Sequence, residues 1–154
     1  MFSKEEKKER NIAFWKTFKN KMNKIPASNG KRIQWLRYPT KIKFIFVRAS
    51  VNKDFAKFSI DIQAKDLEIQ EIVWEQFLEL KMVLENEFNE APIWDENAIN
   101  DAGKSIKQIY WQMDGVNLFN KEDEDKIMDF LKDKYIRFDS FYQEYNEILF
   151  TLLK

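Results

Sequence analysis

At 154 residues, with 44% apolar and 16% aromatic side chains, the chain is long enough for one domain with a substantial core, and its composition excludes intrinsic disorder. It contains no Cys and no His, which removes disulfides, thiol nucleophiles, imidazole metal ligands and the usual general base at neutral pH. The net charge is zero, but residues 1–65 hold 17 Lys and Arg against 5 Asp and Glu, whereas residues 66–154 hold 9 against 21.

This division of charge has two interpretations. A basic face could meet an anion, or the two halves could fold against each other and neutralise one another across one surface. The first ten residues are basic, but no apolar stretch follows them, and no run of 18 apolar residues occurs anywhere. We therefore expect a single domain over residues 1–154, in the cytoplasm, without membrane association, metal or cofactor.

The N-terminal segment predicts a helix over residues 3–25. Ser3 and Glu6 form a capping-box pattern, and Phe14, Phe18, Met22 and Ile25 recur on one stripe. Residues 26–30 are a turn cluster. Residues 33–38 fit either a short strand or a loop packed on the core.

Two strands follow and predict an antiparallel hairpin. Residues 42–49 are apolar at consecutive positions from Phe44 to Val47, which is typical of a strand buried on both faces. Residues 55–64 alternate instead. Their pattern places Phe58, Ile60 and Ile62 on a core face and Lys57, Ser59, Asp61 and Gln63 on a solvated face.

Residues 66–91 predict one long amphipathic helix. Asp66 is a good N-cap, the apolar positions recur at spacings of three and four, and Pro92 ends the pattern. A helix this apolar must lie across the strands on either side of it.

A second hairpin, residues 93–98 and 105–113, precedes a last helix. Ile109, Trp111 and Met113 share one face of the return strand. Asn120 is the expected cap of the helix, with Asp123 in the reciprocal position, and an apolar seam runs from Ile127 to Leu152. The expected fold is α+β, a small, mainly antiparallel sheet of about four strands with packed helices, in the order α-ββ-α-ββ-α.

Several short motifs together carry a family resemblance. They are Trp35-x-x-Tyr38, the segment Ser59 to Asp66, Glu75 to Lys81, Ile93-Trp94, Ile109-Tyr110, Phe119 to Asp123, and Tyr135-Ile136-x-x-Asp139-x-Phe141. Over roughly residues 14–141 the chain resembles an uncharacterised bacterial family of domains of unknown function, common in Bacteroidetes. Its members occur alone or appended to predicted restriction-type nuclease domains. Relatives often carry a His near Ala64, which this chain lacks, and a Pro near Asp133, which favours a helix boundary there.

The candidate catalytic residues are Asp61, Gln63 and Lys65. In PD-(D/E)XK nucleases an acidic residue and an (E/D/Q)-x-K signature at strand ends hold Mg²⁺, and the Lys stabilises developing charge. Gln63-Ala64-Lys65 matches that signature, and Asp54 or Asp61 could supply the carboxylate. A solvated strand face and the N-cap of the following helix explain the same residues without any chemistry.

The candidate anion-binding residues lie in the basic half. Arg37, Lys41, Lys43 and Arg48 surround Trp35 and Tyr38. Basic side chains can neutralise phosphates, and aromatic faces can stack on unpaired bases. The alternative for Trp35 and Tyr38 is that they anchor their loop to the core.

The acidic half offers a protein partner as a third possibility. Residues 122–125 could meet a basic protein, as antidote-type proteins do, although acidic residues in a first helical turn are also favoured by the helix dipole. The C-terminal seam could serve a homodimer. The sequence thus favours a non-enzymatic binding or accessory module, associated with nucleic acid or defence systems, with a divergent metal-dependent nuclease and an acidic antidote as alternatives.

Overall fold

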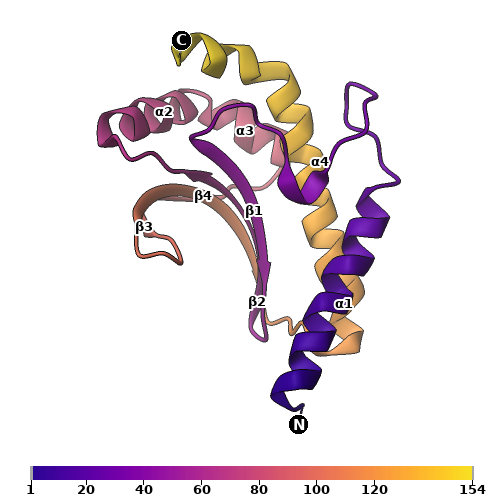
Figure 1. Cartoon of the computed structure of the whole chain (residues 1–154). Coiled ribbons are helices and arrows are strands. Elements are labelled where there is room, and N and C mark those ends of the chain that lie inside the picture. The colour runs from indigo at the N-terminus through magenta and orange to yellow at the C-terminus, as the bar shows by residue number, and fades with distance from the viewer. Residues whose placement is uncertain (1, 154) are drawn as a thin grey trace.

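The computed structural model describes residues 2–153, and its helices lie along the convex side of a strongly curved four-stranded sheet (Figure 1). The predicted α+β class and antiparallel sheet are confirmed. The elements are α1 (Lys4–Met22), the 3₁₀ turn η1 (Trp35–Arg37), β1 (Ile45–Val51), β2 (Phe55–Ile62), α2 (Leu67–Glu79), α3 (Lys81–Phe88), β3 (Ile93–Ile99), β4 (Ser105–Asp114) and α4 (Lys121–Leu152).

The two hairpins join into one sheet of strand order β1-β2-β4-β3, with every neighbouring pair antiparallel. The register aligns Ile60 of β2 with Val47 of β1 and Ile109 of β4, so one row of apolar side chains faces the helices. At the far edge, β3 pairs with β4 through a register shift between Asp95 and Ala98. The central strands are therefore β2 and β4, and β1 and β3 form the edges.

The core is built from aromatic rings that several elements contribute. Phe58 of β2 lies 4.9 Å, centroid to centroid, from Tyr135 of α4 in an edge-to-face arrangement. Phe88 of α3 stacks on Trp111 of β4 at 3.8 Å. Offset and edge-to-face aromatic pairs of this kind add to the free energy gained by burying the rings. These contacts hold α3 and α4 to the covered face of the sheet.

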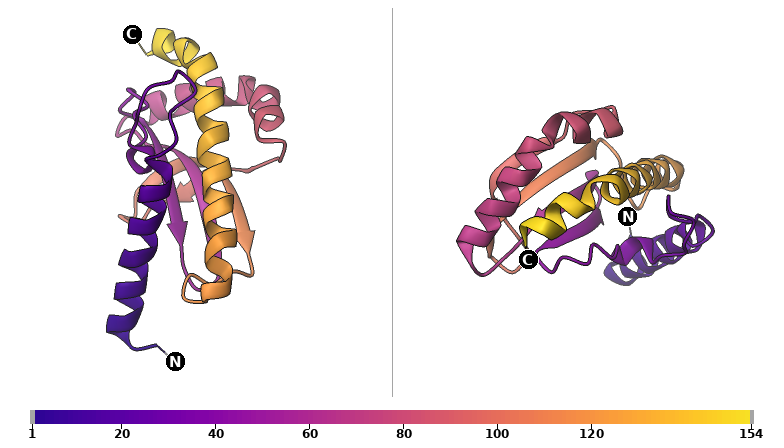
Figure 2. Two further views of the ribbon diagram at one scale, coloured as in Figure 1. Left: turned by 90° about the vertical axis from the view of Figure 1, so that its right-hand side faces the viewer. Right: turned by 90° about the horizontal axis from the view of Figure 1, so that it is seen from above.

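The central segment forms two helices, so the prediction of one helix over residues 66–91 is wrong. Asp66 caps α2 as expected, accepting a hydrogen bond from the Glu68 N–H. The helix breaks at Leu80 (φ −92°, ψ 8°), α2 packs on the sheet, and α3 packs mainly on α4. The right view of Figure 2 shows the change of direction. The second helix ends before Pro92, at Asn89, whose left-handed conformation (φ 52°) is a common helix end.

The final helix α4 confirms the predicted seam and has no boundary at Asp133, contrary to what the Pro of relatives suggests. Arg137 Nε donates to Asp133 Oδ1 at 2.8 Å, and Arg137 Nη1 donates to the Glu87 carbonyl at 2.7 Å, tying α4 to α3. Asn120 caps the helix through the Glu122 N–H. The Asp123 carboxylate accepts from the Asn117 N–H rather than closing a reciprocal box on Asn120.

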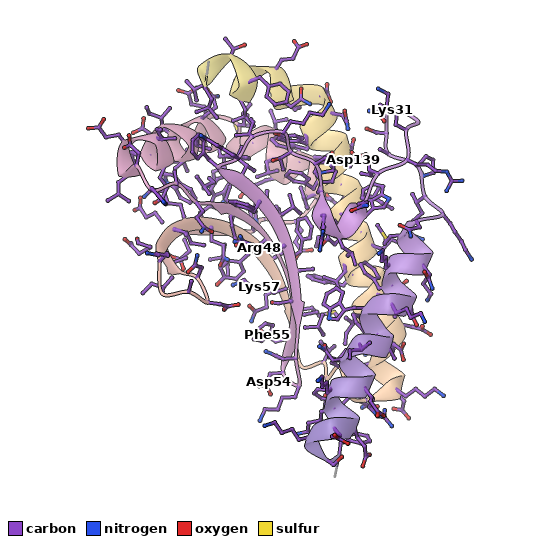
Figure 3. All side chains as sticks on the ribbon, in the orientation of Figure 1. Lys31, Arg48, Asp54, Phe55, Lys57 and Asp139 are labelled. Carbon is purple, nitrogen blue, oxygen red and sulfur yellow. The ribbon has the colours of Figure 1, made fainter. Side chains whose placement is uncertain are left out.

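The segment between α1 and β1 is a packed loop, held to α4 by one buried carboxylate. Asp139 is 1% exposed and accepts hydrogen bonds from the Tyr38 hydroxyl (2.5 Å), the Ser28 N–H (2.6 Å) and Gln143 Nε2 (3.2 Å). The Tyr142 hydroxyl donates to the Thr40 carbonyl at 2.5 Å. In Figure 3, Asp139 lies on α4 where the loop crosses it. This anchoring fixes the position of the basic residues that follow Tyr38.

Within residues 2–153, no helix is both long enough and apolar enough to cross a membrane.

Replacing Asp139 by Ala should lower the free energy of unfolding by about 3 kcal/mol or more, because three hydrogen-bond donors lose a buried charged acceptor. Asp139→Asn should also destabilise the folded chain, because the amide NH₂ group would replace one accepting oxygen and place a donor opposite another donor. Urea unfolding followed by circular dichroism measures the effect. The matched control is Glu144→Ala, an exposed acidic residue on the same helix. Equal midpoints for Asp139→Ala and Glu144→Ala would contradict the anchoring role.

Alkaline pH should destabilise the protein through buried phenols. Burial raises the pKa of Tyr135 well above its ordinary value of 10.0, so this phenol stays neutral in the folded chain. The unfolded chain ionises near pH 10, so this contribution to stability is present below pH 10 and is lost as the pH rises above it. Tyr135→Phe removes the ionisation. The gap in stability between variant and wild type should grow by about 1.4 kcal/mol between pH 8 and pH 11 in the variant's favour.

Urea midpoints at the two pH values measure this gap. Tyr110→Phe, on the open face of the sheet, is the control for loss of a phenol. A gap between wild type and Tyr135→Phe that is no larger at pH 11 than at pH 8 would contradict the assignment.

Candidate functional site

A shallow groove of about 590 Å³ runs beside the edge strand β1. It is lined by the end of η1, the loop over residues 38–43, and β1 itself. All four basic residues predicted to bind an anion line it: Arg37, Lys41, Lys43 and Arg48. The structure thus brings together side chains from two separate elements and the loop that joins them.

Local backbone geometry explains why these basic side chains face outward. From Arg37 to Lys43 buried and exposed residues alternate strictly, so Tyr38, Thr40 and Ile42 point into the protein. The buried Thr40 hydroxyl donates to the Ile42 and Ile45 carbonyls, at 2.9 Å each, and accepts from the Ile42 N–H. Lys41 takes a left-handed conformation (φ 62°) at this turn. The loop is therefore held by its own hydrogen bonds, and its lysines stay in solvent.

The two aromatic residues predicted beside them are part of the core. Trp35 is 2% exposed, and its Nε1 donates to the Ile25 carbonyl at 2.9 Å. Tyr38 is buried against Phe138 and Tyr142. Neither ring has a free face on which a base could stack. Their burial agrees with the alternative that Trp35 and Tyr38 anchor the loop to the core.

Phe46 is the exposed aromatic residue of the groove, and sequence analysis missed it. Residues 42–49 were expected to be buried on both faces, but Phe46 is 36% exposed because its side chain lies opposite Asp61 of β2, on the concave face that points away from the helices. The Arg48 guanidinium carbon lies 4.5 Å from the centre of the Phe46 ring. Their spacing of two residues along a strand was the available signal.

A second hollow, of about 510 Å³, occupies the concave face of the sheet. Its walls come from all four strands and the turn between β3 and β4, and Arg48 also lines the groove described above. In Figure 3, Arg48 and Lys57 lie on the side of β1 away from α1 and α4. The lining residues are Arg48, Ala49, Ser50, Lys57, Ser59, Asp61, Gln63, Ile99, Asn100, Asp101, Ala102 and Gln108.

Asp61 organises the polar side chains of this cavity. Its Oδ2 accepts from Arg48 Nη1 at 2.7 Å, and its Oδ1 accepts from Gln108 Nε2 at 2.8 Å. Arg48 Nη1 also donates to Gln63 Oε1 at 3.3 Å, and Lys57 Nζ donates to Gln108 Oε1 at 2.8 Å. Asp61 was expected on a solvated face, yet its side chain is only 4% exposed because neighbouring strands surround it. Pairing is what makes burial of this carboxylate tolerable.

Lys57 closes the network on the β4 side. Desolvation lowers the pKa of its ammonium group, while the charges of Asp61, Asp95 and Asp101 oppose that shift. The Nζ atom lies 4.1 Å from the centre of the Tyr110 ring. A half-buried ammonium with one fixed acceptor keeps N–H donors for a ligand.

The candidate nuclease residues are only partly brought together. Asp61 and Gln63 line the same cavity, whereas Lys65 is exposed in the turn before α2 and Asp54 is exposed in the turn between β1 and β2. Both carboxylate oxygens of Asp61 already accept hydrogen bonds. Across residues 2–153, no group of three or more His, Cys, Asp or Glu side chains is placed to hold a metal ion.

The two oppositely charged halves make little direct contact through ion pairs. Among the residues that the structure describes, the pair that joins them is Lys21 with Asp125, at 4.0 Å and on the surface. Arg48 pairs within the basic half, and Lys134 and Arg137 pair within the acidic half. The lysines of the groove thus form no ion pair with the described part of the acidic half, residues 66–153. In the acidic turn, Asp123 is engaged in the local cap.

Comparison with known proteins places the chain in a family without a described activity. No curated protein and no solved structure matches it. The family model described as a domain of unknown function, DUF4268, matches residues 11–146. Because this match spans nearly the whole chain of 154 residues, the protein belongs to the DUF4268 family.

Proposed function

We propose that the protein is a non-enzymatic accessory module that binds nucleic acid through the groove beside β1. The observation that carries this proposal is the convergence of Arg37, Lys41, Lys43 and Arg48 on one groove, in which neither lysine pairs with a carboxylate of residues 2–153. Phosphate contacts supply most of the affinity in sequence-independent binding of nucleic acid. A shallow groove of about 590 Å³ suits a phosphate backbone better than an enclosed small molecule.

The arrangement of the basic residues supports an extended backbone as the ligand. Lys41 and Lys43 are both exposed, and the buried residue Ile42 lies between them in the turn that leads into β1. Arg37 and Arg48 line the same groove. Phe46 adds an aromatic face between Lys43 and Arg48, and stacking on such a face is sequence-tolerant.

The alternatives have less support from the contacts. A metal-dependent nuclease would need the Asp61 carboxylate for the metal, but Arg48 and Gln108 occupy both of its oxygens. An acidic antidote would use the first turn of α4, where Asp123 already serves the fold. The resemblance to domains that accompany predicted restriction-type nucleases supports a bacterial, cytoplasmic, DNA-processing or defence setting for an accessory module.

Oligonucleotide binding should weaken steeply with salt. We expect the wild-type chain to bind a fluorescein-labelled 12-mer single strand at 50 mM salt and to lose much of that affinity at 200 mM, because bound phosphates release counterions. Fluorescence anisotropy titrations at several salt concentrations give the slope. The triple variant Arg37→Gln, Lys41→Gln, Lys43→Gln should bind at least about tenfold more weakly and have a slope smaller by about 2.

The matched control is Lys4→Gln, Lys8→Gln, Lys16→Gln, which removes the same charge from exposed positions of α1. Arg48 is left unchanged because its loss would leave Asp61 buried without a counter-charge. Absence of binding at 50 mM salt, or equal weakening by the two triple variants, would overturn the proposal.

A further inference from the structure

We infer that the cavity on the concave face of the sheet takes one unpaired purine base of the strand that the groove holds. This inference rests on the proposed function. It assigns a second role to the site: the groove contacts phosphates, and the cavity contacts a base. It therefore names the class of ligand as single-stranded nucleic acid, since a paired base would not be free to enter.

The groove and the cavity share one wall. Arg48 lines both, and it lies on the same face of the sheet as the cavity, opposite Ser59 of β2. A backbone lying in the groove beside β1 therefore passes the mouth of the cavity at Arg48. The guanidinium group is already stacked against Phe46, with 4.5 Å between its carbon and the ring centre. Flat guanidinium and aromatic surfaces are those on which unpaired bases stack.

The size of the cavity fits a nucleoside-sized group. Its volume of about 510 Å³ lies within the range of small-molecule sites, roughly 300–1,000 Å³. The end of β3 and the turn that follows it form its far wall, where Ile99 is 73% exposed and Asn100 is the next residue. An exposed Ile at the lip of a polar cavity offers an apolar contact for the face of a base.

The polar groups match the edge of a purine. Glutamine amides pair with the N6 and N7 positions of adenine, and lysine donates to O6 and N7 of guanine. Gln108 and Lys57 are adjacent, 2.8 Å apart, and Asp61 holds the Gln108 amide in one orientation. The ammonium of Lys57 and the second N–H of Gln108 remain as donors directed by a fixed network. Both purines present N7 as an acceptor, and pyrimidines have no equivalent atom.

The test uses the full chain and 12-mer single strands that differ at one central position. In an oligothymidine background this position is adenine, guanine, thymine or an abasic spacer, and the series is made in both DNA and RNA. All strands of the series carry the same phosphates, so the phosphate contacts in the groove are the same for each strand. We expect the purine-containing strands to bind at least about fivefold more tightly than the abasic strand, the low end of one good base contact.

Variants then assign the preference to the cavity. Lys57→Met and Gln108→Leu should each abolish the difference between purine and abasic strands, and should leave the affinity for the abasic strand and its salt slope unchanged. Gln112→Leu is the matched control, because it lies on the same strand but bonds Asp114 and does not line the cavity. Thermal unfolding checks that each variant is folded, and the wild-type comparison stands even where a variant is not.

The outcomes separate the two claims. Failure of every strand, abasic included, to bind at low salt overturns the proposed function and this inference with it. Equal binding of purine, thymine and abasic strands by the wild type overturns the inference alone. Tighter binding of thymine than of purines, or a purine preference that Gln112→Leu removes as completely as Gln108→Leu, also overturns it. The comparison of DNA with RNA identifies which polymer supplies the base.

Discussion

The whole structure depends on the fact that helices cover only one side of a curved sheet. Apolar side chains of β2 and β4 turn toward α2, α3 and α4, and burying them is the main source of stability for the fold. Within residues 2–153 no helix lies against the other side of the same strands, so that side must carry groups that tolerate partial hydration. Curvature then draws those groups inward, and this is why a carboxylate, a guanidinium, an amide and an ammonium form one connected network around Asp61.

The N-terminal segment depends on α4 in a different way. Residues between α1 and β1 make no strand with the sheet, and their order comes from polar contacts with one helix and from two buried rings. Tyr38 takes part in both kinds of contact, since its ring packs on Phe138 and its hydroxyl donates a hydrogen bond to Asp139. The same residue precedes the row of outward-pointing lysines. The contacts that stabilise the loop thus also fix the positions of its charged side chains.

Much of this was accessible from local patterns, and the failures have physical causes. Alternation in β2 and β4 identified the two faces correctly, and Ser3, Asp66 and Asn120 were recognised as caps because capping is a local interaction.

The break at Leu80 was missed because an apolar residue continues the helical stripe, and only packing on two different surfaces interrupts it. Alternation predicts which face of a strand a side chain lies on, but not how deeply that side chain is buried. The burial of Asp61 beside Gln108, 47 residues away in sequence, therefore had no local signal. The exposure of Phe46 required knowing that helices pack on the other face of the sheet. The convergence of Arg37, Lys41, Lys43 and Arg48 did follow from their closeness in sequence.

The interrupted pairing of β3 has a consequence for how the molecule meets copies of itself. Open sheet edges attract further strands, and folded proteins avoid this with bulges and charges that disturb the outer row of amide and carbonyl groups. Between Asp95 and Ala98 the register of β3 with β4 shifts, and this shift also interrupts the regular spacing of the N–H and C=O groups on the outer edge of β3. An incoming strand could match only one half of β3 at a time. At the opposite edge, the loop over residues 38–43 and its lysines stand beside β1. Each edge of the sheet thus carries a feature that disfavours pairing with a further strand: an interrupted ladder in β3 and lysines beside β1.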